Sequence, residues 1–277
     1  MNRIFFPSQY LNYFFKAKGL HGIHSAFVYE LFEKVITDFE YYDFAPIEFL
    51  RRKLLHSHKT IEVIDFGAGG PGKKMKKVKD IARVSSISSG KGRLLFRLVN
   101  FMQPKIMVEM GTSLGISTLY QHKACPDASF ITMEGSPQTA SIASENFNLL
   151  KAEGIKQVTG DFKDTLPKLL AGLSTVDYVF FDGNHRKEAT LDYFRSFKEK
   201  ASANTVFVFD DIRWSQGMYE AWNEVIKEPT ATVTVDLFSM GLVFFRPGQV
   251  KEHFVLKFKR FTGVAYIRIL FDALWKR

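Results

Sequence analysis

Acidic residues end or follow five predicted β-strands in the middle of the chain. These acids are Glu109, Glu134, Asp161, Asp182 and the pair Asp210-Asp211. In open α/β sheets, ligands bind beyond the carboxyl ends of the strands, so we expect these side chains to meet along one edge. Carboxylates in such a place can bind ribose hydroxyls, hold a metal ion or help to move a proton. The pattern therefore predicts a ligand site with several acidic contacts.

A glycine-containing loop follows the first of these strands, in the sequence EMGTSLGIST over residues 109–118. Its glycines, Gly111 and Gly115, let the backbone come close to a ligand, and the N–H groups of the following helix can bind an anion. Glu134 ends the next strand, where an acid can bind the two hydroxyls of a ribose. The dinucleotide fingerprint G-x-G-x-x-G is absent here, so the loop suits a nucleoside that carries an amino acid, namely S-adenosylmethionine.

A second glycine-rich segment, Asp65-Phe66-Gly67-Ala68-Gly69-Gly70, also looks like a cofactor loop by itself. No acid ends a second strand at a suitable distance after it, and the lysine-rich segment 73–79 follows instead. We therefore predict a turn without a cofactor role in an N-terminal accessory region, and a solvated helix or a loop for the lysines. His21 and His24 are interpreted as part of a turn before the helical segment 26–37.

An alternation of strands and helices must position these loops. Strands are predicted at 61–66, 105–110, 129–134, 155–159, 177–182, 205–210, 231–238 and 241–246. Helices are predicted at 91–102, 115–123, 136–153, 163–172, 187–200 and 215–228. Apolar strands separated by helices indicate a parallel sheet that is covered on both faces. We expect an α/β fold: a Rossmann-like, doubly wound, mostly parallel sheet of seven strands with an antiparallel C-terminal hairpin, plus a helical N-terminal accessory region.

Five segments together resemble the class I S-adenosylmethionine-dependent methyltransferases. They are EMGTSLGIST, ITMEGSP, GDFKDTLP, DYVFFDGNH and VFVFDDI. Within this class they are most similar to the catechol O-methyltransferase-like, divalent-metal-dependent group. The resemblance covers about residues 105–246 and implies an S-adenosylmethionine-binding domain over 101–250, between an accessory region over 1–100 and a basic, aromatic tail over 251–277.

The resemblance also implies contacts for each part of the cofactor. The residues concerned are Glu109, Gly111, Ser113, Gly115, Ser117, Glu134, Gly135, Ser136, Asp161, Phe162 and Asp182. The first five would surround the methionine portion, Glu134 would bind the ribose, and Asp161 and Phe162 would lie near the adenine.

Asp182, Asp210 and Asp211 are the predicted ligands of a divalent metal ion. Their spacing matches that of the strand-end ligands in the resembling group, and carboxylate oxygens suit Mg²⁺. That group usually has Asp then Asn at the second position, whereas this sequence has Asp then Asp. The alternative is that Asp182 contacts only the cofactor and that Asp210 and Asp211 cap a loop.

His185 stands where the resembling group has a lysine that acts as the base. A histidine can accept a hydroxyl proton near neutral pH, so Asp182 and His185 are the predicted catalytic residues.

The leading hypothesis is O-methylation of a small hydroxylated molecule, such as a catechol, with S-adenosylmethionine as the methyl donor and Mg²⁺ as a further cofactor. Arg213, Trp214 and Met218 could line the acceptor site or simply pack. The alternatives are a metal-independent N-methyltransferase and a non-enzymatic nucleotide- or nucleic-acid-binding module. A nicotinamide-dependent oxidoreductase is disfavoured by the missing fingerprint.

The composition limits which classes of binding partner and which cellular location the sequence supports. The net charge of +9 divides into basic ends and an acidic middle, so no single basic face for nucleic acid is indicated. The single cysteine, Cys125, excludes an internal disulfide, and no apolar run is long enough for a membrane-spanning helix, so the cytoplasm is the expected location. The tail combines basic and aromatic residues, which suits a membrane surface, but we favour docking of its aromatic residues on the domain.

Overall fold

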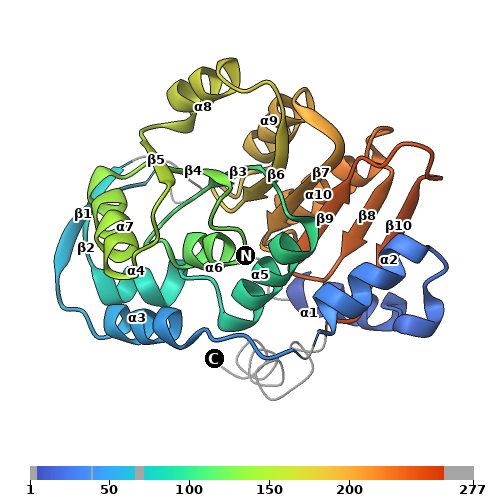
Figure 1. The fold of residues 1–277 in the computed structure, drawn as a ribbon, viewed down its shortest axis with the longest axis horizontal. Helices are drawn as coiled ribbons and strands as arrows, with labels where there is room; N and C mark the ends of the chain where they lie inside the picture. The colour runs from blue at the N-terminus through green and yellow to red at the C-terminus, as the bar shows by residue number, and fades with distance from the viewer. Residues whose placement is uncertain (1–4, 39, 66–71, 259–277) are drawn as a thin grey trace.

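The computed structural model describes residues 5–38, 40–65 and 72–258, and an eight-stranded β-sheet forms the centre of this part of the chain (Figure 1). Its strands are β3 (Ile106–Met110), β4 (Ser129–Glu134), β5 (Ile155–Thr159), β6 (Val176–Phe181), β7 (Ala201–Asp210), β8 (Val233–Asp236), β9 (Met240–Phe244) and β10 (Glu252–Val255). They lie in the order β5-β4-β3-β6-β7-β9-β8-β10, with β9 antiparallel to its neighbours and the other pairs parallel. The predicted mostly parallel α/β sheet with an antiparallel C-terminal hairpin is confirmed.

Strand β10 adds an eighth strand that sequence reasoning does not predict, within the segment expected to be a tail. It pairs in parallel with β8, and Phe254 lies opposite Val235. Its first two residues, Glu252 and His253, are exposed. The four residues of β10 show little alternation of apolar and polar side chains, so their sequence predicts a strand only weakly. Pairing with the edge of the existing sheet decides their conformation. The rest of the predicted tail, from residue 259 onward, lies outside the described residues.

Helices cover both faces of the sheet. One face carries α5 (Ser89–Met102), α6 (Ile116–Ala124) and α7 (Pro137–Leu149), and the other carries α8 (Phe162–Ala171), α9 (Lys187–Lys198) and α10 (Gln216–Lys227). Successive residues of β7 alternate between the faces: Val206 and Val208 pack with the first set, whereas Phe207 and Phe209 pack with the second. Among the described residues, no helix is both long and apolar enough to cross a membrane.

The N-terminal region packs along one side of this three-layer core. It consists of α1 (Phe5–Lys16), the short turn η1 (Leu20–Gly22), α2 (Ala26–Leu31), η2 (Phe32–Ile36), α3 (Ala45–Leu55), β1 (Thr60–Asp65), β2 (Gly72–Lys77) and α4 (Val78–Ser85). His21 lies in η1, directly before α2, so the predicted turn is confirmed. The glycine-rich segment 66–71 lies outside the described residues.

The lysine-rich segment, predicted to be a helix or a loop, divides into two parts: Val78–Ser85 forms the helix α4, as predicted, whereas the lysines before it do not. Residues 72–77 form β2, which pairs antiparallel with β1 so that Lys73 lies opposite Ile64. The Lys73 ammonium also lies 3.1 Å from a carboxylate oxygen of Glu62 on β1. Backbone pairing with β1 therefore outweighs the helical preference of the lysines, whose side chains remain exposed.

Candidate active site

The strand register brings the predicted site residues to one edge of the sheet. Met110 of β3 lies opposite Met133 of β4 and Phe181 of β6, and Phe181 lies opposite Phe209 of β7. The residues that follow these four positions are Gly111, Glu134, Asp182 and Asp210. They therefore end at the same level, as the sequence predicts.

The loop after β3 requires glycine at two positions. Gly111 and Gly115 have φ angles of +102° and +81°, a backbone conformation in which other residues are strained. A Cβ atom on Gly111 would lie 2.5 Å from the carbonyl oxygen of Asp182, and one on Gly115 would lie 2.5 Å from the ring of Phe147. The loops after β3 and β6 therefore meet backbone to backbone, and α6 begins closely packed against α7.

Glu134 connects the end of β4 to this loop. Its carboxylate accepts hydrogen bonds from the backbone N–H of Ser113 at 2.8 Å and from the backbone N–H of Ser136 at 2.9 Å. Burial raises the pKa of Glu134, and these N–H donors act in the opposite direction. Each carboxylate oxygen keeps a lone pair that can accept a hydroxyl hydrogen. The geometry therefore suits the predicted ribose contact, which stays a prediction.

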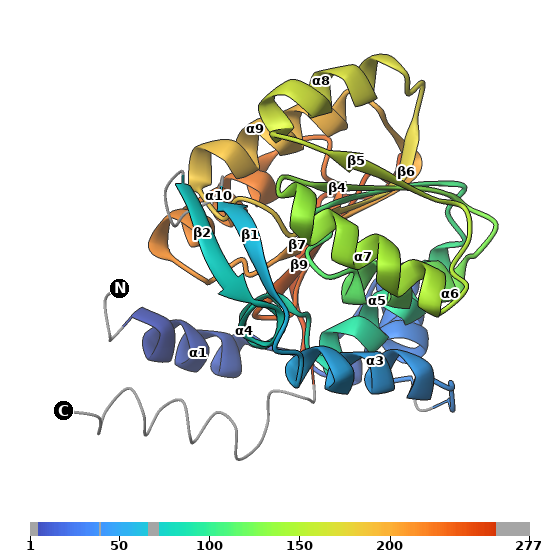
Figure 2. The ribbon, with the colours of Figure 1, turned by 90° about the vertical axis from the view of Figure 1, so that its left-hand side faces the viewer.

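The β1–β2 hairpin lies beside α7, the helix that follows β4 (Figure 2). The backbone N–H of Ile64 donates to Oγ of Ser136 at 3.3 Å, and the backbone N–H of Glu62 donates to the side chain of Gln138 at 2.7 Å. Ser136 is thus almost fully buried under β1, while Gly135 before it is half-buried. The N-terminal region therefore contributes one wall of the predicted cofactor site.

Glu109 and Ser117 lie in the interior of the protein. Glu109 is fully buried, and its carboxylate accepts hydrogen bonds from Thr118, from Gln121 at 2.8 Å and from Thr132 at 2.7 Å. Ser117 is also buried and lies next to the same carboxylate. The Glu109 carboxylate thus connects α6 to β4 in the interior. This burial does not favour the direct contact with the cofactor that the resemblance implies for Glu109 and Ser117, and that contact stays a prediction.

Asp161 and Phe162 begin α8 at the end of β5. Asp161 caps this helix by accepting a hydrogen bond from the backbone N–H of Lys163 at 3.0 Å. The ring of Phe162 packs closely on Gly183, where a Cβ atom would lie 2.7 Å from it, and makes an edge contact with Tyr193. Phe162 thus spans the ends of β5 and β6, and its predicted place near an adenine stays a prediction.

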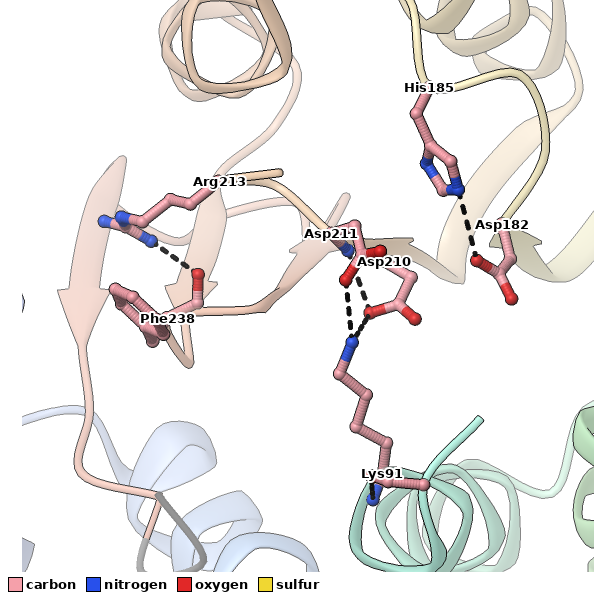
Figure 3. Close-up of polar contacts among 8 residues, drawn as sticks. Lys91, Asp182, His185, Asp210, Asp211, Arg213 and Phe238 are labelled. Carbon is pink, nitrogen blue, oxygen red and sulfur yellow. Dashed lines mark hydrogen bonds and ion pairs between the residues drawn. The ribbon is translucent and has the colours of Figure 1, made fainter. Parts of the chain in front are cut away.

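Lys91 of α5 forms ion pairs with Asp210 and Asp211 at the end of β7 (Figure 3). Its Nζ lies 2.5 Å from Oδ1 of Asp210 and 2.9 Å from Oδ1 of Asp211. Burial lowers the pKa of Lys91, but the two carboxylates more than offset this and raise it above its ordinary value. The side chain therefore carries a positive charge at neutral pH.

Asp182 and His185 face this ion pair from the end of β6 (Figure 3). Nε2 of His185 lies 3.8 Å from Oδ1 of Asp182. Burial raises the pKa of Asp182 well above its ordinary value, and the carboxylates of Asp210 and Asp211 raise it further. The sequence thus predicts correctly that Asp182, His185 and the Asp210-Asp211 pair come together.

These acids do not fit the predicted divalent metal in this arrangement. Among the residues that the structure describes, no three His, Cys, Asp or Glu side chains are grouped so that they could hold a metal ion. Asp210 and Asp211 each direct an oxygen at the Lys91 ammonium instead. Mg²⁺ requires near-octahedral oxygen ligands, which an ammonium within the ligand set opposes. In this structure the pair holds Lys91, and its role as metal ligands stays a prediction.

A cavity of about 390 Å³ opens beside His185, and its lining includes Lys187, Trp214 and Glu220. Trp214 is half exposed there, in agreement with a place in the wall of an acceptor site. Arg213 and Met218, the other two predicted wall residues, are buried and pack inside the protein. The Arg213 guanidinium holds both carboxylate oxygens of Asp236, at 2.8 and 2.6 Å.

Lys91 is the site residue that sequence reasoning misses. It lies in the first turn of α5, where the helix dipole disfavours a cation, and that turn contains no acid. A lysine in such a place indicates a carboxylate partner elsewhere in the fold. That unfavourable position is the signal that could have identified it.

Residues 108–212, which contain the predicted site residues from Glu109 to Asp211, match a family model described as a methyltransferase domain. This part of the chain is therefore similar to methyltransferase domains. The catechol O-methyltransferases of Niastella koreensis and Mycobacterium tuberculosis are each 30% identical to the chain, over 130 and 129 residues. Both alignments cover 46% of this chain, and 58% and 57% of the relatives. The chain thus spans less than two thirds of the curated relatives that it matches.

Solved structures share the fold of the methyltransferase domain. An O-methyltransferase from Bacillus cereus in complex with SAH has a TM-score of 0.51 and 21% identity, and covers 58% of this chain and 83% of its own. The O-methyltransferase TomG from Streptomyces achromogenes, in complex with SAM, has a TM-score of 0.52 and 20% identity, and covers 58% and 82%. With the family model and the curated relatives, they confirm the resemblance to S-adenosylmethionine-dependent methyltransferases of the catechol O-methyltransferase type.

Proposed function

We propose that this protein transfers a methyl group from S-adenosylmethionine to a hydroxyl oxygen of a small molecule. The observation that carries this proposal is the placement of Glu134 and His185 on one sheet edge, where the loops after β3 and β6 touch at Gly111 and Asp182. An acid that can accept ribose hydroxyls thus lies near a base that borders a cavity. We keep the cytoplasm as the predicted location, because the chain has a single cysteine.

S-adenosylmethionine would bind between the glycine loop and the ends of β4 and β5. Glu134 would accept hydrogen bonds from the ribose, and the backbone at Gly111 would lie close to the methionine portion. Phe162 would offer the flat face of its ring to the adenine, with Asp161 beside it. When bound, this cofactor supplies a methyl group on a positively charged sulfur, which becomes a neutral thioether after transfer.

His185 would accept the proton of the acceptor hydroxyl. Asp182, at 3.8 Å from Nε2, can orient the imidazole ring and stabilise its charged form. The cavity beside His185 includes the half-exposed ring of Trp214, which suits a flat acceptor such as a phenol or a catechol. Catalysis would come mainly from holding the acceptor oxygen in line with the methyl group.

A methyl-transfer assay with labelled S-adenosylmethionine and a panel of catechols, simple phenols and small amines tests this proposal. We expect transfer to hydroxyl compounds, and His185→Ala should lower the rate by about 10²–10⁴-fold because the proton acceptor is lost. His56→Ala, which changes an exposed histidine at the end of α3, is the matched control and should keep the wild-type rate. Transfer to amines alone would support the N-methyltransferase alternative, and no transfer to any class would contradict the proposal.

A further inference from the structure

Lys91 reaches the edge of the sheet from α5 and places its ammonium between two carboxylates of β7. Only 13% of the Lys91 side chain and 6% of the Asp210 side chain are exposed, so water screens this contact poorly. An ammonium has three N–H donors, and two of them are directed at Asp210 and Asp211. Within the described part of the chain, no third acceptor bonds to this ammonium. One donor therefore remains for a ligand at the edge of the sheet.

We propose that the Lys91 ammonium supplies the positive charge that a divalent metal would supply at the acceptor end of this site. The inference rests on the proposed function. Lys91 would hold Asp210 and Asp211 in place and donate its third N–H to the acceptor oxygen. The hydroxyl proton would pass to His185, the methyl group from sulfur to oxygen, and Lys91 would keep all its protons. Methyl transfer by this protein would then need no added metal.

Lys91 and a divalent ion would compete for the same oxygen atoms. Oδ1 of Asp210 already accepts hydrogen bonds from Lys91 at 2.5 Å and from the backbone N–H of Asp211 at 2.8 Å. Because Mg²⁺ binds carboxylate oxygens at about 2.1 Å, an ion on this atom would lie within about 5 Å of the ammonium. Two cations so close together repel strongly at a site that is poorly screened by water. The arrangement therefore favours one fixed cation.

Manganese binding to the full-length protein, followed by the electron paramagnetic resonance signal of free Mn²⁺, tests this inference without turnover. The wild type should leave the signal unchanged. Lys91→Ala and Lys91→Gln remove the ammonium but leave Asp182, Asp210 and Asp211, so both should bind Mn²⁺ and lower the signal. Lys187→Ala is the matched control, because Lys187 also contacts two carboxylates, those of Glu220 at 3.1 Å and Glu224 at 2.8 Å. Its Mn²⁺ binding should match that of the wild type.

Stoichiometric Mn²⁺ binding by the wild type would overturn the inference, and so would an equal gain in Lys187→Ala. Folded Lys91 variants that bind no Mn²⁺ would also count against it, because the acids would then offer no place for a metal. If the Lys91 variants do not fold, the wild-type result decides. Turnover in excess EDTA should equal turnover without it, and a loss that Mg²⁺ restores would overturn the inference. Absence of turnover under all conditions would count against the proposed function instead and leave the Mn²⁺ result valid.

Discussion

The two halves of the active-site edge hold their carboxylates in different ways. In the β3–β4 half, Glu109 and Glu134 are surrounded by neutral donors, which are hydroxyl, amide and backbone N–H groups. In the β6–β7 half, Asp210 and Asp211 share the ammonium of Lys91. Neutral donors orient a carboxylate without cancelling its charge. An ammonium orients the carboxylate and also balances its charge. The first half therefore suits the ribose hydroxyls, through Glu134, and the second suits an acceptor oxygen that becomes negative.

Removing Lys91 should have the largest effect on stability. Lys91→Met leaves two shielded carboxylates without their cation and should lower the free energy of unfolding by about 3–5 kcal/mol, as for other broken buried ion pairs. Lys34→Met is the control, because Lys34 contacts Glu30 in an exposed pair along one helical face, and its loss should change the stability far less. Urea denaturation measures both. A loss for Lys91→Met as small as that of the control would show that Lys91 does not compensate the acids.

The same comparison explains how much of the site the sequence could predict. The β3–β4 half is local, because Gly111, Gly115 and Glu134 follow consecutive strands, and strand ends can be read from apolar runs and glycines. Lys91 is 119 residues away from Asp210, and no periodicity connects the two. The identity of the acids was therefore predictable, whereas the cation that accompanies them depends on how α5 packs on the sheet.

Side-chain direction and strand pairing were also beyond the sequence. Glu109 ends a strand as predicted, but the pleat of β3 turns its carboxylate into the interior, toward Thr132 and Gln121. Strands β2 and β10 carry lysines or exposed polar residues, so their patterns resemble loops. Their conformation comes from pairing with the backbone of a neighbouring strand, which is the preceding β1 for β2 and the strand β8 for β10.

Removing a neutral donor from the β3–β4 half should have a smaller effect. Thr132→Val takes one of the hydrogen bonds from the buried Glu109 carboxylate and should lower the free energy of unfolding by about 1–3 kcal/mol. Thr230→Val, at an exposed threonine beside Glu228, should stay within about 0.5 kcal/mol of the wild type. Urea denaturation again provides the measurement. If Thr132→Val costs as much as Lys91→Met, the two halves do not differ in the way described.

The smallest expected effect is the pH dependence of cofactor binding. Burial raises the pKa of Glu134, and the deprotonated form accepts the ribose hydrogen bonds, so affinity should be full above this pKa and fall as the pH drops through it. The fall should begin at a higher pH than for an ordinary glutamate, whose pKa is about 4.3. The loss of binding free energy should reach about 1 kcal/mol, which is the difference between a charge-assisted and a neutral hydrogen bond. Calorimetry at several pH values measures it, and an equal fall in Glu134→Gln would assign it to another group.

Calorimetric titration of the full-length protein with S-adenosylmethionine tests the central claim most directly. The wild type should bind at one site, and Glu134→Ala should bind about 10- to 100-fold more weakly, because charge-assisted hydrogen bonds to the ribose are lost. Glu145→Ala, which removes an exposed acid on α7 that contacts Lys59 at 3.1 Å, should bind as the wild type does. No binding by the wild type, or equal affinity in Glu134→Ala, would contradict the assignment of this edge as the cofactor site.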